Sequence, residues 1–182
     1  MTRIRPALIK AAVLLLGLVF ATGFRCHAQP TEYQIKAAFI YNFARFVEWP
    51  AEAFASTNSP MVIGVLGKNV FEDSLQRTIN GKVIKGHPLQ FKAFNSPEEA
   101  TNCHVLFIST SEKNRMPKIL AQLQGTSILT VTENTDTFTA SGGMINLVIV
   151  EDKVRFQINN DAAKKSGLII SSKLLSLAVN SP

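Results

Sequence analysis

Met61-Val62-Ile63-Gly64-Val65-Leu66-Gly67 is an uninterrupted apolar stretch that follows the turn-forming residues Asn58-Ser59-Pro60. A strand with one face in water alternates apolar and polar side chains, whereas a continuous apolar run is typical of a strand that is covered on both faces. Residues 105–108 form a second run of this kind, and residues 127–131 are predicted to form a third strand. We therefore expect a sheet with parallel strands at its centre.

Segments with helical spacing of apolar residues separate these strands. Residues 33–47 place Ile35, Phe39 and Phe43 on one stripe, and Pro50 ends the helix because the residue before a proline is displaced from the α region. Further helices are predicted at 67–79, after Ser96, from Ser109 to Leu123, at 159–166 and at 172–178, with capping boxes at Ser96/Glu99 and Ser109/Glu112.

The remaining segments are predicted to be extended. They are residues 82–85 and 89–94, and a late antiparallel hairpin formed by 144–150 and 154–158. Strands that alternate with helices indicate right-handed parallel crossovers. The predicted fold is α/β, a single domain with a mixed, mostly parallel sheet flanked by helices and a late antiparallel hairpin.

The N-terminus has the pattern of a cleavable signal peptide. Arg3, Arg5 and Lys10 precede the apolar run 11–21, which is shorter than the roughly 20 residues of a membrane span. Small residues before Gln29 predict cleavage after Ala28, which leaves residues 29–182 as one periplasmic domain. A lipid anchor on Cys26 and an uncleaved N-terminal anchor are the alternatives.

Cleavage would also change the charge and the cysteine count. The signal peptide contains four of the 19 basic residues and no acidic residue, so the net charge falls from +6 to +2. Without a long basic run, the mature chain lacks the electrostatic pattern of a nucleic-acid-binding protein. Cys103 is the one cysteine left, so no intramolecular disulfide can form, and its place beside an apolar strand predicts burial.

The mature chain shows no pattern that is typical of a catalytic centre. It contains two histidines, of which His87 is predicted to be a solvated turn residue and His104 a hydrogen-bonded strand residue. These two and Cys103 lack the spacing of a metal site, and neither a Gly-x-Ser-x-Gly elbow nor a P-loop occurs in the mature chain. We predict a protein that is not an enzyme and uses no cofactor or metal.

Two strand ends are candidates for a ligand crevice. Lys68 and Asn69 follow one predicted parallel strand, and Ser109 and Thr110 follow its neighbour. Open α/β sheets bind ligands at the carboxyl ends of their strands, so a small anionic ligand is one hypothesis for this position. The alternative is that these residues only cap the helices that follow.

Aromatic residues are concentrated in residues 33–49, which contain six of the 15 aromatics of the chain. One buried stripe does not require so many rings, and exposed aromatics are common anchors of interfaces. Tyr41, Phe46 and Trp49 are therefore the candidate partner-binding residues. Packing beneath the C-terminal helix is the alternative role for Tyr41 and Trp49.

Several of these segments resemble the YfiR family of exported bacterial proteins. The similar segments span most of the mature chain: residues 35–50, 63–67, 103–108, 156–159, 167–168 and 171–178. The resemblance implies a periplasmic repressor that binds an inner-membrane diguanylate cyclase, so that its loss raises cyclic di-GMP and biofilm formation; a homodimer is a further expectation. Better-known members have disulfide-forming cysteines near the late strands, whereas residues 140–151 contain none.

Two functions of different classes remain open. The first is a protein-binding regulator that represses a membrane-anchored signalling protein. The second is a periplasmic small-molecule sensor or binding module that acts on another membrane receptor. A large apolar patch around the first helix of the mature chain favours the regulator, and a deep pocket near Lys68 and Ser109 favours the sensor.

Overall fold

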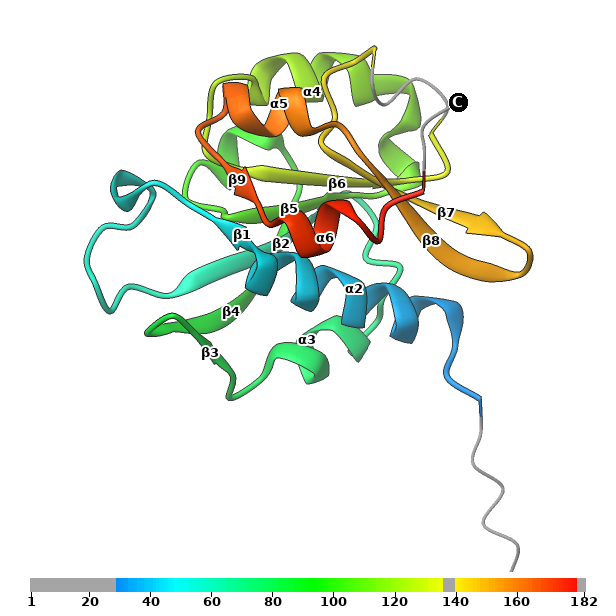
Figure 1. Ribbon diagram of the computed structural model, residues 1–182, viewed down its shortest axis with the longest axis horizontal. Helices are drawn as coiled ribbons and strands as arrows, with labels where there is room; N and C mark the ends of the chain where they lie inside the picture. Colours follow the sequence, from blue (N-terminus) through cyan, green and yellow to red (C-terminus); the bar gives the residue numbers. More distant parts are fainter. Residues whose placement is uncertain (1–28, 136–139, 180–182) are drawn as a thin grey trace, which may run out of the picture. The chain divides into compact units, whose positions relative to one another are not determined.

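The strands of the central sheet follow the order β3-β4-β2-β5-β6-β7-β8 in a computed structural model that describes residues 29–135 and 140–179 (Figure 1). The predicted signal peptide, with Cys26, lies outside the described residues. Contacts divide the chain after Pro30, and the sheet belongs to the second unit, Thr31–Pro182.

The sheet is mixed and mostly parallel, as predicted. β2 pairs in parallel with β4 on one side and with β5 on the other, and β5, β6 and β7 continue the parallel series. β8 is antiparallel to β7, which confirms the late hairpin, and β3 is antiparallel to β4. The strands are β2 (Met61–Leu66), β3 (Val83–Ile84), β4 (His87–Phe94), β5 (Val105–Ile108), β6 (Leu129–Glu133), β7 (Ile145–Val150) and β8 (Lys153–Ile158).

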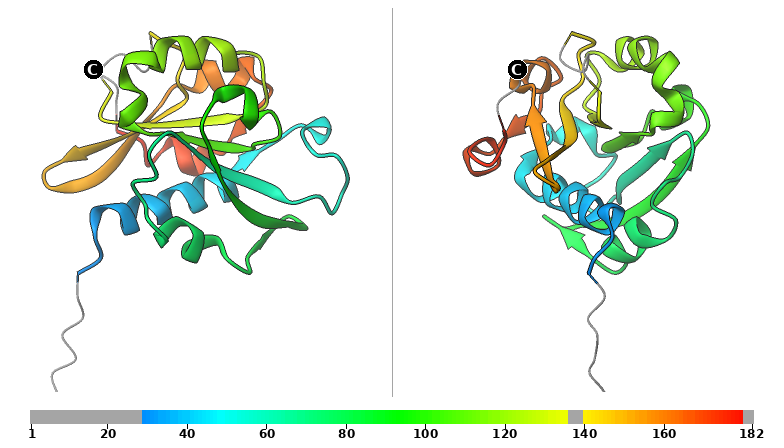
Figure 2. Two further views of the ribbon diagram at one scale, coloured as in Figure 1. Left: turned by 180° about the vertical axis from the view of Figure 1, so that it is seen from behind. Right: turned by 90° about the vertical axis from the view of Figure 1, so that its right-hand side faces the viewer.

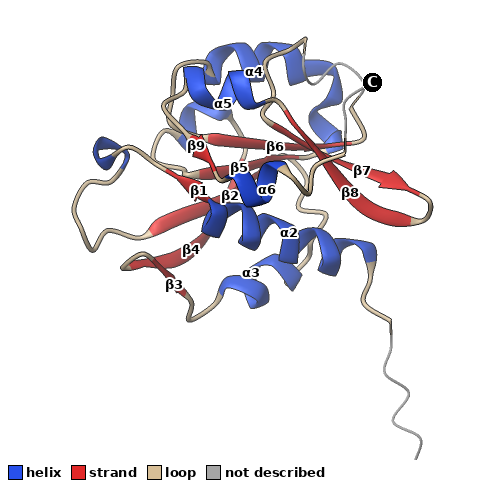
Figure 3. Ribbon diagram, viewed as in Figure 1, coloured by secondary structure: helices blue, strands red, loops and turns tan. Residues whose placement is uncertain are grey.

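Helices cover both faces of the sheet (Figures 1 and 3). Ile63 and Val65 of β2 pack in the core that includes residues of α2 and α3, whereas Val62 and Leu66 pack in a second core that includes residues of α4. All six residues of β2 are buried, as the apolar run predicted. The helices are α2 (Glu32–Phe46), α3 (Ser74–Ile79), α4 (Met116–Leu123), α5 (Asn160–Lys165) and α6 (Ser172–Leu175).

The first helix begins at a complete capping box. The Gln34 amide donates to the Thr31 hydroxyl at 3.3 Å, and the Thr31 amide donates to the Gln34 side-chain oxygen at 2.9 Å. Both bonds satisfy amides that lack a partner inside the helix. α2 then runs along one face of the sheet, with α3 beside it (Figure 2).

The predicted helix at 67–79 is wrong in its first half. The chain forms turns there, and only Ser74–Ile79 is helical. Gly67 and Glu72 have φ angles of 86° and 52°, and the Asn69 side chain accepts from the Phe71 amide and donates to the Glu72 carbonyl. Such local bonds compete with the helical pattern, and a positive φ interrupts it.

The two helix starts predicted from capping boxes also differ from the structure. Ser96 makes no side-chain cap, and the short 3₁₀ helix η2 (Pro97–Ala100) follows it; Glu99 accepts from the Asn95 amide instead. After Ser109 the chain forms the 3₁₀ helix η3 (Thr110–Arg115) before α4 begins. Ser109 caps the Ser111 amide, but Glu112 pairs with Arg115 rather than completing a capping box.

A second, two-stranded sheet was not predicted. β1 (Val47–Glu48) continues from α2 and pairs antiparallel with β9 (Ile169–Ile170), so that Val47 lies opposite Ile170. The 3₁₀ helix η1 (Ala51–Ala53) follows β1. This small sheet joins the end of the first helix to the last part of the chain. Within the described part of the chain, no helix has the length and apolar character needed to cross a bilayer.

Candidate functional site

The aromatic rings of α2 divide into two groups. Tyr33, Phe39 and Phe43 form the first group, and their rings contact other rings of the domain: Tyr33 lies edge-on to Phe71 at 5.5 Å, and Phe39 and Phe43 both contact Phe156 at 5.4 and 5.1 Å. These three residues connect α2 to the turn before α3 and to β8. They serve packing, which leaves the second group as candidates for binding.

Tyr41 and Phe46 belong to the second group, and both are half-buried. Cations lie over their exposed rings. The Lys82 ammonium is 4.0 Å from the Tyr41 centroid, the Lys173 ammonium is 5.5 Å from the Phe46 centroid, and the Arg45 guanidinium is 5.7 Å from both centroids. The structure therefore places both predicted binding residues next to Arg45 of the same helix, and each ring lies near a second cation from another segment.

Trp49 follows β1 and is also half-buried. Its ring lies edge-on to His104 at 6.4 Å, and its buried indole N–H has no hydrogen-bond partner. Trp49 lines a cavity of about 330 Å³ together with Glu48, Phe54, Lys85 and others. A buried donor without an acceptor costs about 1–3 kcal/mol, so packing alone holds this ring in place.

Two histidines hold the segment after Trp49 against the sheet. His104 is buried: its Nδ1 accepts from the Val62 amide at 3.0 Å, and its Nε2 lies 3.1 Å from the Ala53 carbonyl. These contacts confirm the predicted hydrogen-bonded role and assign the neutral tautomer with the proton on Nε2. Burial, more than the nearby His87, lowers the pKa of His104.

The prediction for His87 is wrong. His87 is the first residue of β4 and is half-buried rather than solvated, with Nδ1 2.8 Å from the Ser59 carbonyl. The Phe54 ring lies stacked between the two histidines, 3.8 Å from His87 and 4.5 Å from His104. The Phe54 ring shields His87 from solvent, and the flanking Gly86 and Pro88 gave no indication of this contact.

The two predicted ligand-binding strand ends contact each other directly. The Lys68 amide donates to the Ser111 hydroxyl at 2.9 Å, and a Cβ atom added at Gly67 would lie 2.5 Å from the same oxygen. Ser109 is fully buried, whereas Lys68 and Thr110 are exposed and Asn69 bonds to its own turn. The ligand crevice at these four residues stays a prediction.

A buried ion pair, which no sequence pattern indicates, lies at the carboxyl end of β6. Lys36 and Glu133 are 1% and 2% exposed; the Lys36 ammonium pairs with Glu133 and also with Glu32, and the Tyr33 hydroxyl donates to Glu133 at 3.3 Å. Burial lowers the pKa of Lys36, but the bonds to Glu133 and Glu32 outweigh it and the pKa is raised. This network fixes α2 on the sheet.

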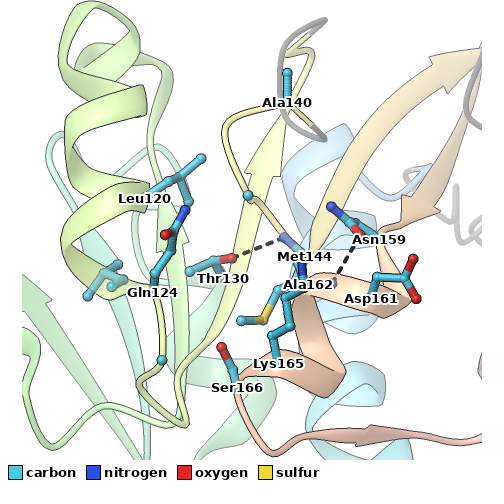
Figure 4. A pocket seen from close by; sticks show the side chains of 13 residues that line it. Leu120, Gln124, Thr130, Ala140, Met144, Asn159, Asp161, Ala162, Lys165 and Ser166 are labelled. Atoms are coloured by element: carbon cyan, nitrogen blue, oxygen red, sulfur yellow. Dashed lines mark hydrogen bonds between the residues drawn. The ribbon is translucent and has the colours of Figure 1, made fainter.

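A larger cavity, of about 420 Å³, lies between α4 and α5 (Figure 4). Gln124 and the buried Thr130 line one wall, and Asp161 and Lys165 of α5 line another, with Leu120 among the apolar lining. Thr130 accepts from the Met144 amide at 3.1 Å. No sequence motif indicates this cavity, because its walls come from separate segments of the chain.

Cys103 is buried, as predicted, and burial raises the pKa of its thiol to about 12. A thiol of this kind is chemically inert because the thiolate is the reactive form. Residues 29–135 and 140–179 contain no cluster of His, Cys, Asp and Glu that could hold a metal ion.

A comparison with protein families matches residues 33–179 to the family described as YfiR/HmsC-like. The chain belongs to this family. The match covers both the aromatic helix α2 and the C-terminal segment that pairs with β1. YfiR/HmsC-like proteins are periplasmic regulators of cyclic di-GMP signalling.

Comparisons outside the YfiR/HmsC-like family add little. No curated protein matches the chain. A solved structure described as the ABC domain in complex with L-Trp from Streptococcus pneumonia is similar to 81% of this chain, with 14% identity and a TM-score of 0.49, and the chain spans 59% of that structure's length. A similarity at this level indicates neither a shared ligand nor a shared function.

Proposed function

We propose that this protein is a periplasmic regulator that binds a membrane-anchored diguanylate cyclase and represses it, which lowers cyclic di-GMP. It acts by binding rather than by catalysis. The YfiR/HmsC-like match supports a regulator of cyclic di-GMP signalling in general. The observation that carries the finer proposal is the group of half-exposed rings at the end of α2 and just beyond it.

Tyr41, Phe46 and Trp49 have the properties of interface anchors. Aromatic residues and arginine are enriched in binding hot spots because they offer a large, rigid contact area with a polar tip. Tyr41 and Phe46 keep part of their rings accessible, and Arg45 lies between them. An acceptor from a partner would also satisfy the Trp49 indole N–H if binding brought it into reach.

Paired measurements on two classes of variant test the proposal. Tyr41→Ala and Trp49→Ala should weaken partner binding by about thirtyfold, which corresponds to about 2 kcal/mol. Cyclic di-GMP should then rise in cells that contain these variants at periplasmic abundance equal to wild type. Phe43→Ala is the matched core control, because it should lower stability by about 3–5 kcal/mol and reduce abundance instead.

The result that would contradict the proposal is normal repression by both variants in a folded state. Melting curves show whether each variant is folded. Only a variant whose cooperative transition lies near that of wild type can be used to judge binding. The interface would then lie elsewhere, and the first helix would serve the core alone.

The cavity between α4 and α5 favours a second candidate, a small-molecule sensor acting on another membrane receptor. Polar groups of opposite charge, Asp161 and Lys165, line it beside an apolar wall. Its size falls within the range of ligand pockets. A polar metabolite that raises the melting temperature of wild type, but not of Gln124→Ala or Lys165→Ala, would support the sensor.

A further inference from the structure

Two rings and three cations alternate in a row on the surface around the end of α2. The order is Lys82, Tyr41, Arg45, Phe46, Lys173, and each ring lies within 5.7 Å of the cations on both sides. Tyr41, Arg45 and Phe46 belong to α2; Lys82 lies in the turn after α3, and Lys173 in α6. Three separate elements thus converge on this cation–ring row.

The positive charge of the cation–ring row is not neutralised within the described residues. The ion pairs found there are Lys36 with Glu32 and Glu133, Arg77 with Asp73, Lys85 with Glu48, and Arg115 with Glu112. None of them includes Arg45, Lys82 or Lys173, and all three side chains are exposed. A cation over a ring gains about 0.5–1 kcal/mol at an exposed site, but the ring carries no opposite charge.

We propose that the cation–ring row binds an acidic segment of a protein partner, with carboxylates at Arg45, Lys82 and Lys173 and side chains between them on Tyr41 and Phe46. This inference rests on the proposed function, because it assigns the chemistry of the partner at the same surface. Arginine matches a carboxylate with two parallel hydrogen bonds, and complementary charge steers association.

The geometry favours a peptide segment over an anionic membrane surface. Binding to a lipid surface depends on apolar side chains that insert into the bilayer in addition to positive charge. Here the rings are half-buried and flanked by cations, so neither protrudes as a bare apolar anchor. A row of alternating charged and flat groups instead matches an extended chain, whose side chains recur at regular intervals.

The test uses the full exported protein and a labelled peptide in which glutamate and tyrosine alternate at every second position with serine between them, so that both lie on one face of an extended chain. Fluorescence anisotropy should show binding to wild type that weakens as salt is added, because salt screens exposed charges. The variant Arg45→Gln/Lys82→Gln/Lys173→Gln should lose at least about tenfold in affinity. The matched control Lys113→Gln/Lys118→Gln/Lys164→Gln removes the same charge from η3, α4 and α5, and should bind within about twofold of wild type.

A peptide with glutamine in place of glutamate separates charge recognition from ring stacking. Equal binding of this peptide, or equal binding of the acidic peptide to the cation–ring variant, would overturn the proposal. Vesicles of phosphatidylglycerol and phosphatidylcholine provide the third arm. If wild type binds these vesicles through the row and does not bind the acidic peptide, the occupant is a membrane surface and the proposal is wrong.

Cyclic di-GMP in cells separates this inference from the proposed function. Suppose that Tyr41→Ala relieves repression while the cation–ring variant represses normally and binds the peptide like wild type. This result supports the proposed regulator and contradicts the acidic-peptide site. If neither variant relieves repression although the peptide binds through the row, the result contradicts the repressor proposal and supports the acidic-peptide site. Relief of repression by both, with loss of peptide binding in the cation–ring variant, supports the two together.

Discussion

Lys36 and Glu133 show how much two side chains contribute to the position of the first helix. Both charges are almost fully removed from water, and each is satisfied chiefly by the other. Removing one partner leaves the remaining charge buried, which commonly costs about 3–5 kcal/mol, whereas replacing both by apolar residues of similar size is often neutral.

The first prediction concerns this pair. Lys36→Met alone and Glu133→Leu alone should each lower the free energy of unfolding by about 3–5 kcal/mol, and the double variant should recover most of the loss. Urea unfolding of the four proteins measures the coupling. A double variant as unstable as the sum of the singles would show that the two residues act independently.

The raised pKa of Lys36 gives this pair a pH dependence as well. A lysine whose folded pKa lies above its unfolded value of 10.5 adds stability that is complete below that pH and is lost as the pH rises through the folded pKa. Wild type should therefore lose stability above about pH 10.5, more steeply than the double variant.

The second prediction concerns His104, whose lowered pKa acts at the opposite end of the pH range. The unfolded chain takes up a proton below about pH 6.5, while burial keeps His104 of the folded chain neutral. Stability is therefore complete above pH 6.5 and falls as the pH drops from there towards the lowered folded pKa.

Melting curves between neutral and mildly acidic pH measure this loss. His104→Asn should be less stable at neutral pH, since the Ala53 carbonyl loses its donor, but its stability should depend less on acid. Equal acid dependence in wild type and His104→Asn would assign the effect to another group.

At the scale of elements, apolar runs predicted the strands better than spacing predicted the helices. β2, β5 and the β7–β8 hairpin follow their predictions because apolar runs mark β2, β5 and β7 in the sequence, and alternation marks β8. The turn at residues 67–73 was missed because the Asn69 side chain, rather than the apolar spacing, decides the backbone there.

The third prediction concerns the start of α2. Thr31→Ala should lower the free energy of unfolding by about 1 kcal/mol, because the Gln34 amide loses its acceptor at the helix start. Thr31→Ser keeps the hydroxyl and should stay close to wild type. Urea midpoints compare the two variants, and an equal loss in both would mean that the cap does not contribute.

At the scale of the whole molecule, the sequence was informative about the fold and about the candidate residues, but not about their surroundings. Tyr41, Phe46 and Trp49 are candidates on aromatic density alone, whereas two of the cations near the rings come from other segments, Lys82 from the turn after α3 and Lys173 from α6. Lys36 and Glu133 are 97 positions apart in the sequence, and no local sequence pattern predicts a contact between such distant residues.

The fourth prediction concerns the mature chain. Intact-mass measurement on a periplasmic extract should give the mass of residues 29–182, because signal cleavage is predicted after Ala28. A Cys26→Ala variant should be exported and cleaved in the same way. A mass that includes Cys26 and a lipid adduct, or a chain that stays in the membrane fraction, would contradict the prediction.

The pairing of β1 with β9 sets an order of assembly for an exported chain. Val47 pairs with Ile170, so the end of α2 is joined to a strand near the far end of the sequence. A chain that is translocated from its N-terminus delivers α2 before β9. Lys173, which completes the cation–ring row beside Phe46, follows β9. The proposed partner-binding surface is therefore incomplete until α6 has followed α2 across the membrane.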